Sequence, residues 1–178
     1  LLACVANDWT TEDYLDPNHP LQLRVRDTVV ELTGEPVEHS GTDGCGAPVH
    51  AVSLGGLARA IGRVSGGSGG EASMLTEAIL ADPWAIDGAG RANTLVIEEL
   101  GLIAKLGAEG VLVLGAQSGI AVAVKILDGS SRAATLVALE LMVEAGEVSR
   151  SAATEVLERS LEPVLGGGRV VGSILPAF

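Results

Sequence analysis

The sequence GVLVLGAQSGIAVAVKI, residues 110–126, contains the clearest β-strand pattern in the chain. Two apolar runs, 110–115 and 120–126, consist largely of valine, leucine, isoleucine and alanine, and the four residues Ala-Gln-Ser-Gly separate them. Runs of this length and composition are typical of strands, and the short connection with glycine indicates a hairpin. We therefore expect an antiparallel hairpin that is buried on at least one face.

Helical patterns lie on both sides of this hairpin. A helix should begin near Pro20, since proline suits the first turn, and should end at Gly34, since glycine is a common terminator. The other expected elements are helices over 1–6, 54–64, 74–80, 93–100, 132–144 and 152–161 and a final strand over 169–175. This order of elements predicts an α+β fold in which helices flank an antiparallel sheet.

The connecting segments are rich in glycine, proline and small polar residues. We expect residues 35–50 to be irregular and the SGGSGG stretch at residues 65–70 to form a flexible surface loop. The glycines of that stretch follow no predicted strand and precede no Lys-Ser or Lys-Thr pair, so they do not indicate a phosphate-binding loop.

Composition limits the classes of protein and partner. The chain has 178 residues, of which 47% are hydrophobic and 19% are charged, which excludes intrinsic disorder. Its 11 basic and 23 acidic residues give a formal net charge of −12, and the cations are scattered, which disfavours nucleic acid and anionic membranes as partners. No apolar run reaches the roughly 18 residues of a membrane-spanning helix.

The number of cysteines indicates the cellular compartment, and the first residues indicate whether further sequence precedes them. Two cysteines are far fewer than a secreted disulfide-rich domain contains, so we expect a cytoplasmic protein. We interpret Cys4 as a small buried residue of the first helix. The sequence starts at Leu1 within an apolar run that looks like the middle of a helix, and we expect further sequence ahead of it.

The segment TDGCGAP places Cys45 in a tight loop where packing alone gives little reason for a thiol. Asp43 lies two residues earlier, so both side chains would point to the same side of an extended segment and could address a cation or an amine. A zinc site needs three or four ligands, and no second cysteine lies close by. His39 and His50 flank the loop and are available as ligands, although such histidines are more often solvated or hydrogen-bonded.

Lys105 lies in the sequence AKLGAEG, residues 104–110, where a Lys-x-Gly element leads into the first strand of the hairpin. In serine β-lactamases a Lys-Thr-Gly on an edge strand lines the active site and supplies a cation. The alternative is a solvated lysine in front of a hairpin. The only other lysine, Lys125, is interpreted as a strand residue whose charged end lies in solvent.

The sequence lacks a complete catalytic set of residues. It contains no Ser-x-x-Lys motif, because Leu102 and Val122 stand three residues before the two lysines. Ser40, Ser130 and Ser131 lie in turns without a lysine or a histidine and aspartate at a suitable spacing, and we interpret them as caps.

Several motifs together resemble the Rhizobium-etli-type L-asparaginase family, also called asparaginase II. They are YLDPNHPLQ at 14–22, DGCGAP at 43–48, GAGR at 88–91, KLGAEGV at 105–111, KILDG at 125–129 and VGSILP at 171–176. The resemblance covers the whole chain. The combination of DGCGAP with Lys-x-Gly-Ala-Glu-Gly is its most specific part.

The resemblance implies an amidohydrolase with a serine β-lactamase or glutaminase-like fold that hydrolyses L-asparagine to L-aspartate and ammonia. It implies that residues 1–178 are the C-terminal portion of a single domain, and we expect a homodimer. The nucleophile of the family is the serine of an early Ser-x-x-Lys motif. A Cys-Ser-Gly-Lys-His segment, which normally lies directly before the position of Leu1, supplies a cysteine and a lysine to a zinc ion.

Three residues of this chain match the family's site residues. By resemblance, Cys45 is similar to the zinc-binding cysteine, Asp43 to the active-site aspartate and Lys105 to the active-site lysine of the Lys-x-Gly strand. The nucleophile, its lysine and two metal ligands match nothing in the 178 residues.

Two other classes of function stay open at this point. A β-lactamase or transpeptidase relative would share the fold and the Lys-x-Gly strand, and acylation by penicillin would distinguish it from an amidase. A non-catalytic binding or assembly domain is the second alternative, and the absence of a Ser-x-x-Lys motif ahead of Leu1 would favour it. The preference for asparagine or glutamine is not determined by these residues.

Overall fold

The computed structural model describes residues 1–67 and 70–177, and the chain divides into two compact units, Leu1–Ala60 and Ile61–Phe178. Helix α3 (Leu54–Ser65) contains the boundary between the units. Before α3, the first unit contains α1 (Leu2–Ala6), α2 (Pro20–Thr33) and the strands β1 (Ser40–Thr42) and β2 (Pro48–His50).

The longest helix of the first unit, α2, has the boundaries that the sequence predicts. Pro20 occupies its first position, and Gly34 ends it in the left-handed conformation with φ of 69°. The imidazole of His19 caps its start, because Nδ1 accepts a hydrogen bond from the backbone N–H of Leu21 at 3.1 Å. This helix is therefore capped by local hydrogen bonds at both ends.

The prediction of an irregular segment over residues 35–50 is wrong in its second half. Strands β1 and β2 form an antiparallel hairpin in which Ser40 pairs with His50 and Thr42 pairs with Pro48. Each strand is three residues long and contains no run of apolar residues, so the pattern that indicates a strand is missing from the sequence.

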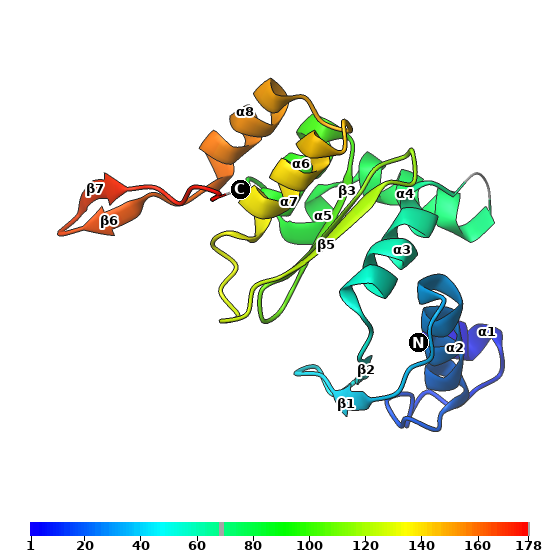
Figure 1. The fold of residues 1–178 in the computed structure, drawn as a ribbon. Helices are drawn as coiled ribbons and strands as arrows, with labels where there is room; N and C mark the ends of the chain where they lie inside the picture. The colour runs from blue at the N-terminus through cyan, green and yellow to red at the C-terminus, as the bar shows by residue number, and fades with distance from the viewer. Residues whose placement is uncertain (68–69, 178) are drawn as a thin grey trace. The chain divides into compact units, whose positions relative to one another are not determined.

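The second unit contains a three-stranded sheet, a separate hairpin and several helices (Figure 1). In chain order its elements after α3 are α4 (Gly70–Ala81), α5 (Trp84–Asp87), α6 (Ala92–Leu100), β3 (Ile103–Gly107), β4 (Val111–Gly115), β5 (Ala121–Lys125), α7 (Ala134–Glu144), α8 (Arg150–Ser160), β6 (Val164–Gly166) and β7 (Arg169–Gly172).

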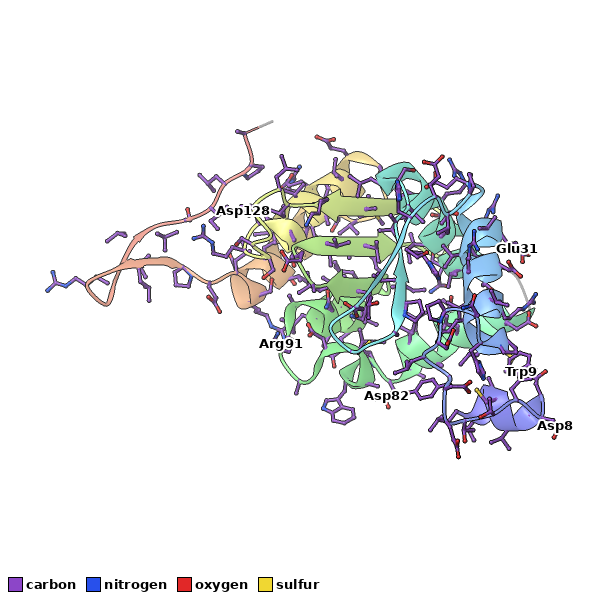
Figure 2. All side chains as sticks on the ribbon, turned by 90° about the horizontal axis from the view of Figure 1, so that it is seen from below. Asp8, Trp9, Glu31, Asp82, Arg91 and Asp128 are labelled. Carbon is purple, nitrogen blue, oxygen red and sulfur yellow. The ribbon has the colours of Figure 1, made fainter. Side chains whose placement is uncertain are left out.

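The sheet has the antiparallel order β3-β4-β5, so β4 is its central strand (Figure 2). Strands β4 and β5 are the predicted hairpin. Leu112 and Leu114 of β4 are almost fully buried, and they belong to one core cluster with Leu139 and Met142 of α7. Helix α7 contacts β4 and β5, and α6 contacts β3 and α8. The predicted α+β class, with helices flanking an antiparallel sheet, is confirmed.

Close packing against β4 requires a glycine at its last position. A Cβ atom added to Gly115 would lie 2.7 Å from Ser65 Oγ and 2.8 Å from Ile61 Cγ2, both on the last turns of α3. These distances are shorter than a van der Waals contact, so only glycine allows this approach of helix and strand.

Three details of the second unit differ from the prediction. Lys105 lies inside a strand of its own, β3, rather than ahead of the first strand of the hairpin. The final strand ends at Gly172 and pairs with β6 instead of joining the main sheet. Residues 84–87, expected to be part of a loop, form the short helix α5.

The predicted glycine-rich loop over residues 65–70 is shorter than expected. Ser65 ends α3 and Gly70 begins α4, while residues 68–69 lie outside the described residues. Within 1–67 and 70–177, no helix combines the length and the apolar character needed to cross a membrane.

The core around β4 predicts a large difference between two leucine-to-alanine substitutions. Leu139 is 0% exposed, so Leu139→Ala should leave a cavity and lower the free energy of unfolding by about 2–5 kcal/mol. Leu127 is 96% exposed, and Leu127→Ala removes the same atoms from the surface, with an expected change within about 0.5 kcal/mol. Urea unfolding followed by circular dichroism measures both, and equal losses would contradict this core.

Candidate functional site

The turn between β1 and β2 brings Asp43 and Cys45 together. The backbone N–H of Asp43 donates to the carbonyl of Ala47 at 2.9 Å, and that of Gly46 donates to the carbonyl of Asp43 at 2.8 Å, which closes the turn. Gly46 has φ of 86°, a conformation that glycine adopts without strain. The Cys45 thiol donates to Asp43 Oδ2 at 3.6 Å, and both side chains are exposed. A thiol and a carboxylate therefore face solvent side by side, as expected.

The same hairpin pairs Ser40 with His50, a contact that no local sequence pattern predicts. Ser40 Oγ lies 2.8 Å from Nδ1 of His50, its cross-strand partner, so the interpretation of Ser40 as a cap without a nearby histidine is wrong. His50 Nε2 is buried and has no hydrogen-bond partner within the described residues. Ten residues separate the two side chains in sequence, and only knowledge of the strand register would have revealed the pair.

The residues that the structure describes do not form a complete zinc site. Among the described residues, no group of three or more His, Cys, Asp or Glu side chains is placed to hold a metal ion. Cys45 is a chemically suitable ligand, because its sulfur is exposed and already adjoins the carboxylate of Asp43. Cys45 thus fits as one zinc ligand, and the other described residues do not supply the remaining two or three.

The segment that carries the hairpin is closed at its two ends by Glu35 and Ser53. Glu35 Oε1 accepts a hydrogen bond from the backbone N–H of Ser53 at 2.5 Å, and Oε2 accepts one from the Ser53 hydroxyl at 2.8 Å. Ser53 Oγ in turn accepts from the N–H of Gly56 in the first turn of α3. These bonds to the ionised carboxylate lower the pKa of Glu35, with the backbone bond as the largest cause.

Lys105 lies in the second unit on β3, an edge strand of the described three-stranded sheet. Its neighbour Ala104 is buried in the core cluster, whereas the side chain of Lys105 is exposed and its Nζ donates to the carbonyl of Leu106 at 2.5 Å. The alternation of a strand explains this arrangement, because successive side chains point to opposite faces. The ammonium group is available to a ligand at this face of the sheet.

The three predicted site residues are thus divided between the units. Asp43 and Cys45 are in contact in the first unit, and Lys105 belongs to the second. Ser130 has the turn role expected of it, since its Oγ accepts from the backbone N–H of Arg132 at 3.4 Å.

The chain matches one family of known proteins along nearly its whole length. The sequence model of the L-asparaginase II family matches residues 1–176. No curated protein matches the chain.

The carboxylate of Glu35 predicts a pH-dependent contribution to stability. Because the pKa of Glu35 is lowered on folding, its contribution is present above about pH 4.5, the ordinary value, and is lost as the pH falls through the lowered pKa. Glu35→Gln should therefore reduce the urea midpoint at pH 7, and the difference from the unmodified protein should shrink as the pH falls below 4.5.

Glu38→Gln is the matched control, since Glu38 is an exposed carboxylate in the same segment with no hydrogen bond to a described residue. It should change the midpoint little at any pH. A Glu35→Gln effect of the same size at pH 7 and pH 3 would show that the charge has no part in closing this segment.

Proposed function

Because the chain belongs to the L-asparaginase II family, we propose that the protein is an L-asparaginase that hydrolyses L-asparagine to L-aspartate and ammonia. The observation that carries this proposal is the family match over residues 1–176. The family supports an asparaginase-type amidohydrolase, and the choice of asparagine as substrate is our proposal. A homodimer and a cytoplasmic location stay predictions from the sequence.

The proposal assigns the nucleophile to residues ahead of position 1. None of the serines in the 178 residues is followed by a lysine three positions later. In the family that this chain resembles, the attacking serine belongs to such a motif, and acyl transfer needs a nucleophile with an adjacent base. Residues 1–178 then supply binding and electrostatic groups to a reaction that starts at that serine.

Lys105 is proposed as one of these electrostatic groups. Its exposed ammonium group on an edge strand resembles the lysine that lines the site of serine β-lactamases. Attack on an amide carbonyl places negative charge on its oxygen, and a fixed cation lowers the energy of that state more than it lowers the energy of the substrate. Lys105 would act in this way without accepting or donating a proton.

Asp43 is proposed as the group that binds the amino end of the substrate. A carboxylate on an exposed turn can accept hydrogen bonds from the α-ammonium group of asparagine, and a charged acceptor makes such bonds stronger. The Cys45 thiol donates to Asp43 Oδ2 only while it is protonated. As a zinc-bound thiolate Cys45 would have no proton to donate, and the carboxylate would be free to accept from the substrate.

Cys45 is proposed as one ligand of a zinc ion whose other ligands lie outside residues 1–178. The exposed sulfur beside a carboxylate fits this role, and the closure of the segment by Glu35 and Ser53 holds its turn in place. Bound zinc would supply a positive charge and a rigid connection to the segment that contributes the other ligands.

Lys105→Ala tests the assignment of the cation. Removing one preorganised group of this kind typically costs roughly 10²- to 10³-fold in turnover, so kcat for ammonia release from L-asparagine should fall by that factor. Lys125→Ala is the control, because it removes the only other lysine, which is also exposed on a strand and donates to the carbonyl of Glu109. Circular dichroism should show both variants folded, and an unchanged kcat in Lys105→Ala would remove Lys105 from the site.

Cys45→Ala tests the metal ligand. Loss of a directly bound sulfur should cost more than the roughly 10- to 100-fold that the loss of a supporting group costs, so zinc affinity should fall by at least a factor of about ten. Elemental analysis after dialysis measures the bound zinc, with Cys4→Ala as the control that removes the buried thiol. Equal zinc content in Cys45→Ala and the unmodified protein would exclude Cys45 as a ligand.

A further inference from the structure

A cavity of about 450 Å³ lies in the second unit, where the starts of α6 and α7 meet the end of α8. We refer to it as the helix-end cavity. Its volume is in the range that small-molecule sites occupy in proteins. None of the three site residues discussed above lines it, and neither the family match nor the sequence motifs give it a role.

Two buried polar side chains line the helix-end cavity without a hydrogen-bond partner. Asn93 and Thr135 are 3% and 9% exposed, and the side chain of neither forms a hydrogen bond with a residue that the structure describes. The large majority of buried polar groups in proteins do have a partner. Both side chains line the same cavity, and so does Ser160, whose Oγ is fully buried without a partner among the described residues. A ligand in the cavity can supply these hydrogen bonds.

The backbone adds partial positive charge at the same place. Asn93 and Thr135 each occupy the second position of their helices, α6 and α7. The carboxylate of Asp87 already accepts a hydrogen bond from the backbone N–H of Asn93 at 3.3 Å, whereas the N-cap residue of α7 makes no side-chain hydrogen bond to its first turn. The free N–H groups of a helix start attract anions, and the start of α7 offers such groups to the helix-end cavity.

The charged side chains around the cavity leave one cation without an ionic partner. Arg91, labelled in Figure 2, pairs with Asp87 at 3.6 Å, and Arg159 pairs with Glu99 at 2.6 Å. Arg132 also lines the cavity, and its guanidinium forms no ion pair with any of the residues described. The three arginines and two acidic residues of the lining sum to one positive charge, in a chain whose net charge is −12.

We propose that the helix-end cavity binds the carboxylate group of a small organic molecule. Arg132 offers a planar pair of donors that matches a carboxylate, and Asn93 and Thr135 supply neutral hydrogen bonds beside it. The apolar lining residues Leu106 and Leu161 leave room for a carbon skeleton, which inorganic phosphate lacks. This site does not depend on the proposed amidohydrolase function, because it is inferred from groups that the hydrolysis does not use.

Glu162, the other acidic residue of the lining, bears on which class of carboxylate the cavity prefers. Glu162 forms no ion pair with a described residue, and it follows the end of α8, where the helix dipole is negative. These negative groups favour a ligand that also carries an amino group, such as a free amino acid, over a simple dicarboxylate. L-aspartate and succinate differ by that amino group alone and are therefore suitable probes.

The test is titration of the intact protein with L-aspartate, succinate or inorganic phosphate, followed by calorimetry and by the NMR amide signals of Asn93 and Thr135. L-aspartate should shift both signals saturably, and phosphate should not. Arg132→Gln should weaken that binding roughly 10- to 100-fold, because it removes a charged hydrogen-bonding group. Arg169→Gln should leave binding unchanged, since Arg169 is exposed on β7 and does not line the cavity.

Two further variants test the site independently of Arg132 and distinguish an amino acid from a dicarboxylate as the ligand. Thr135→Val preserves the shape of a buried side chain and should weaken binding of both carboxylates, which tests the site if Arg132→Gln alters the fold. Glu162→Gln should weaken L-aspartate and leave succinate unchanged if the ligand is an amino acid, and should affect neither if it is a dicarboxylate.

The proposal is wrong if neither carboxylate shifts the Asn93 and Thr135 signals, or if phosphate binds as tightly as they do. These readouts follow binding rather than ammonia release. A protein that binds carboxylates here and hydrolyses nothing would refute the proposed function alone, and an active enzyme with an unresponsive cavity would refute only this inference.

Discussion

Burial of the central strand β4 is the constraint on which the second unit depends. The strand pairs with β3 along one edge and with β5 along the other, so its backbone hydrogen bonds are all satisfied within the sheet. Its side chains at Leu112 and Leu114 then need apolar partners, which α7 provides through Leu139 and Met142. The absence of a side chain at Gly115 lets the last turns of α3 approach the same strand. Sheet order and helix placement both follow from this one buried strand.

The placement of possible functional groups follows from the same packing. Because Ala104 is buried against the core, the alternation of β3 places Lys105 on the opposite face of an edge strand. Its side chain is exposed there, although Ile103 and Val113 on the same face are buried. The helices that cover the sheet bring their ends together, and the helix-end cavity lies at these ends rather than within the apolar core. A sheet that is well packed in its middle thus leaves its polar groups at an edge strand and at helix termini.

The sequence predicts those elements whose signal is local. The valine-rich runs around residues 110–126 and the Pro20 and Gly34 boundaries of α2 are such signals, and the structure confirms them. The β1–β2 hairpin was missed because three-residue strands carry no apolar pattern. Strand β3 was missed because Lys105 and the glycines around it indicate a connection when they are considered without the neighbouring strand.

The site was predicted to a different extent than the fold. Asp43, Cys45 and Lys105 were singled out from their local motifs, and their roles, taken from the resemblance to a family, stay predictions. The contact of Asp43 with Cys45 followed from their spacing. The Ser40–His50 pair depends on strand register, and the helix-end cavity depends on segments around residues 91, 132 and 160 that meet only in the folded unit. No pattern within a single segment contains that information.

The two units hold their polar groups by different physical means, and this difference affects how each group can act. Lys105 is fixed by a strand that pairs along its length and adjoins the apolar core, so its position is independent of any ligand. Asp43 and Cys45 lie on an exposed turn that is held by backbone bonds within the hairpin and by the Glu35 carboxylate at the ends of the segment. A metal ion bound at Cys45 would add a constraint that the turn itself lacks, so metal binding and order of this hairpin would be coupled. The proposed zinc ligand would therefore contribute to the structure of the site as well as to its charge.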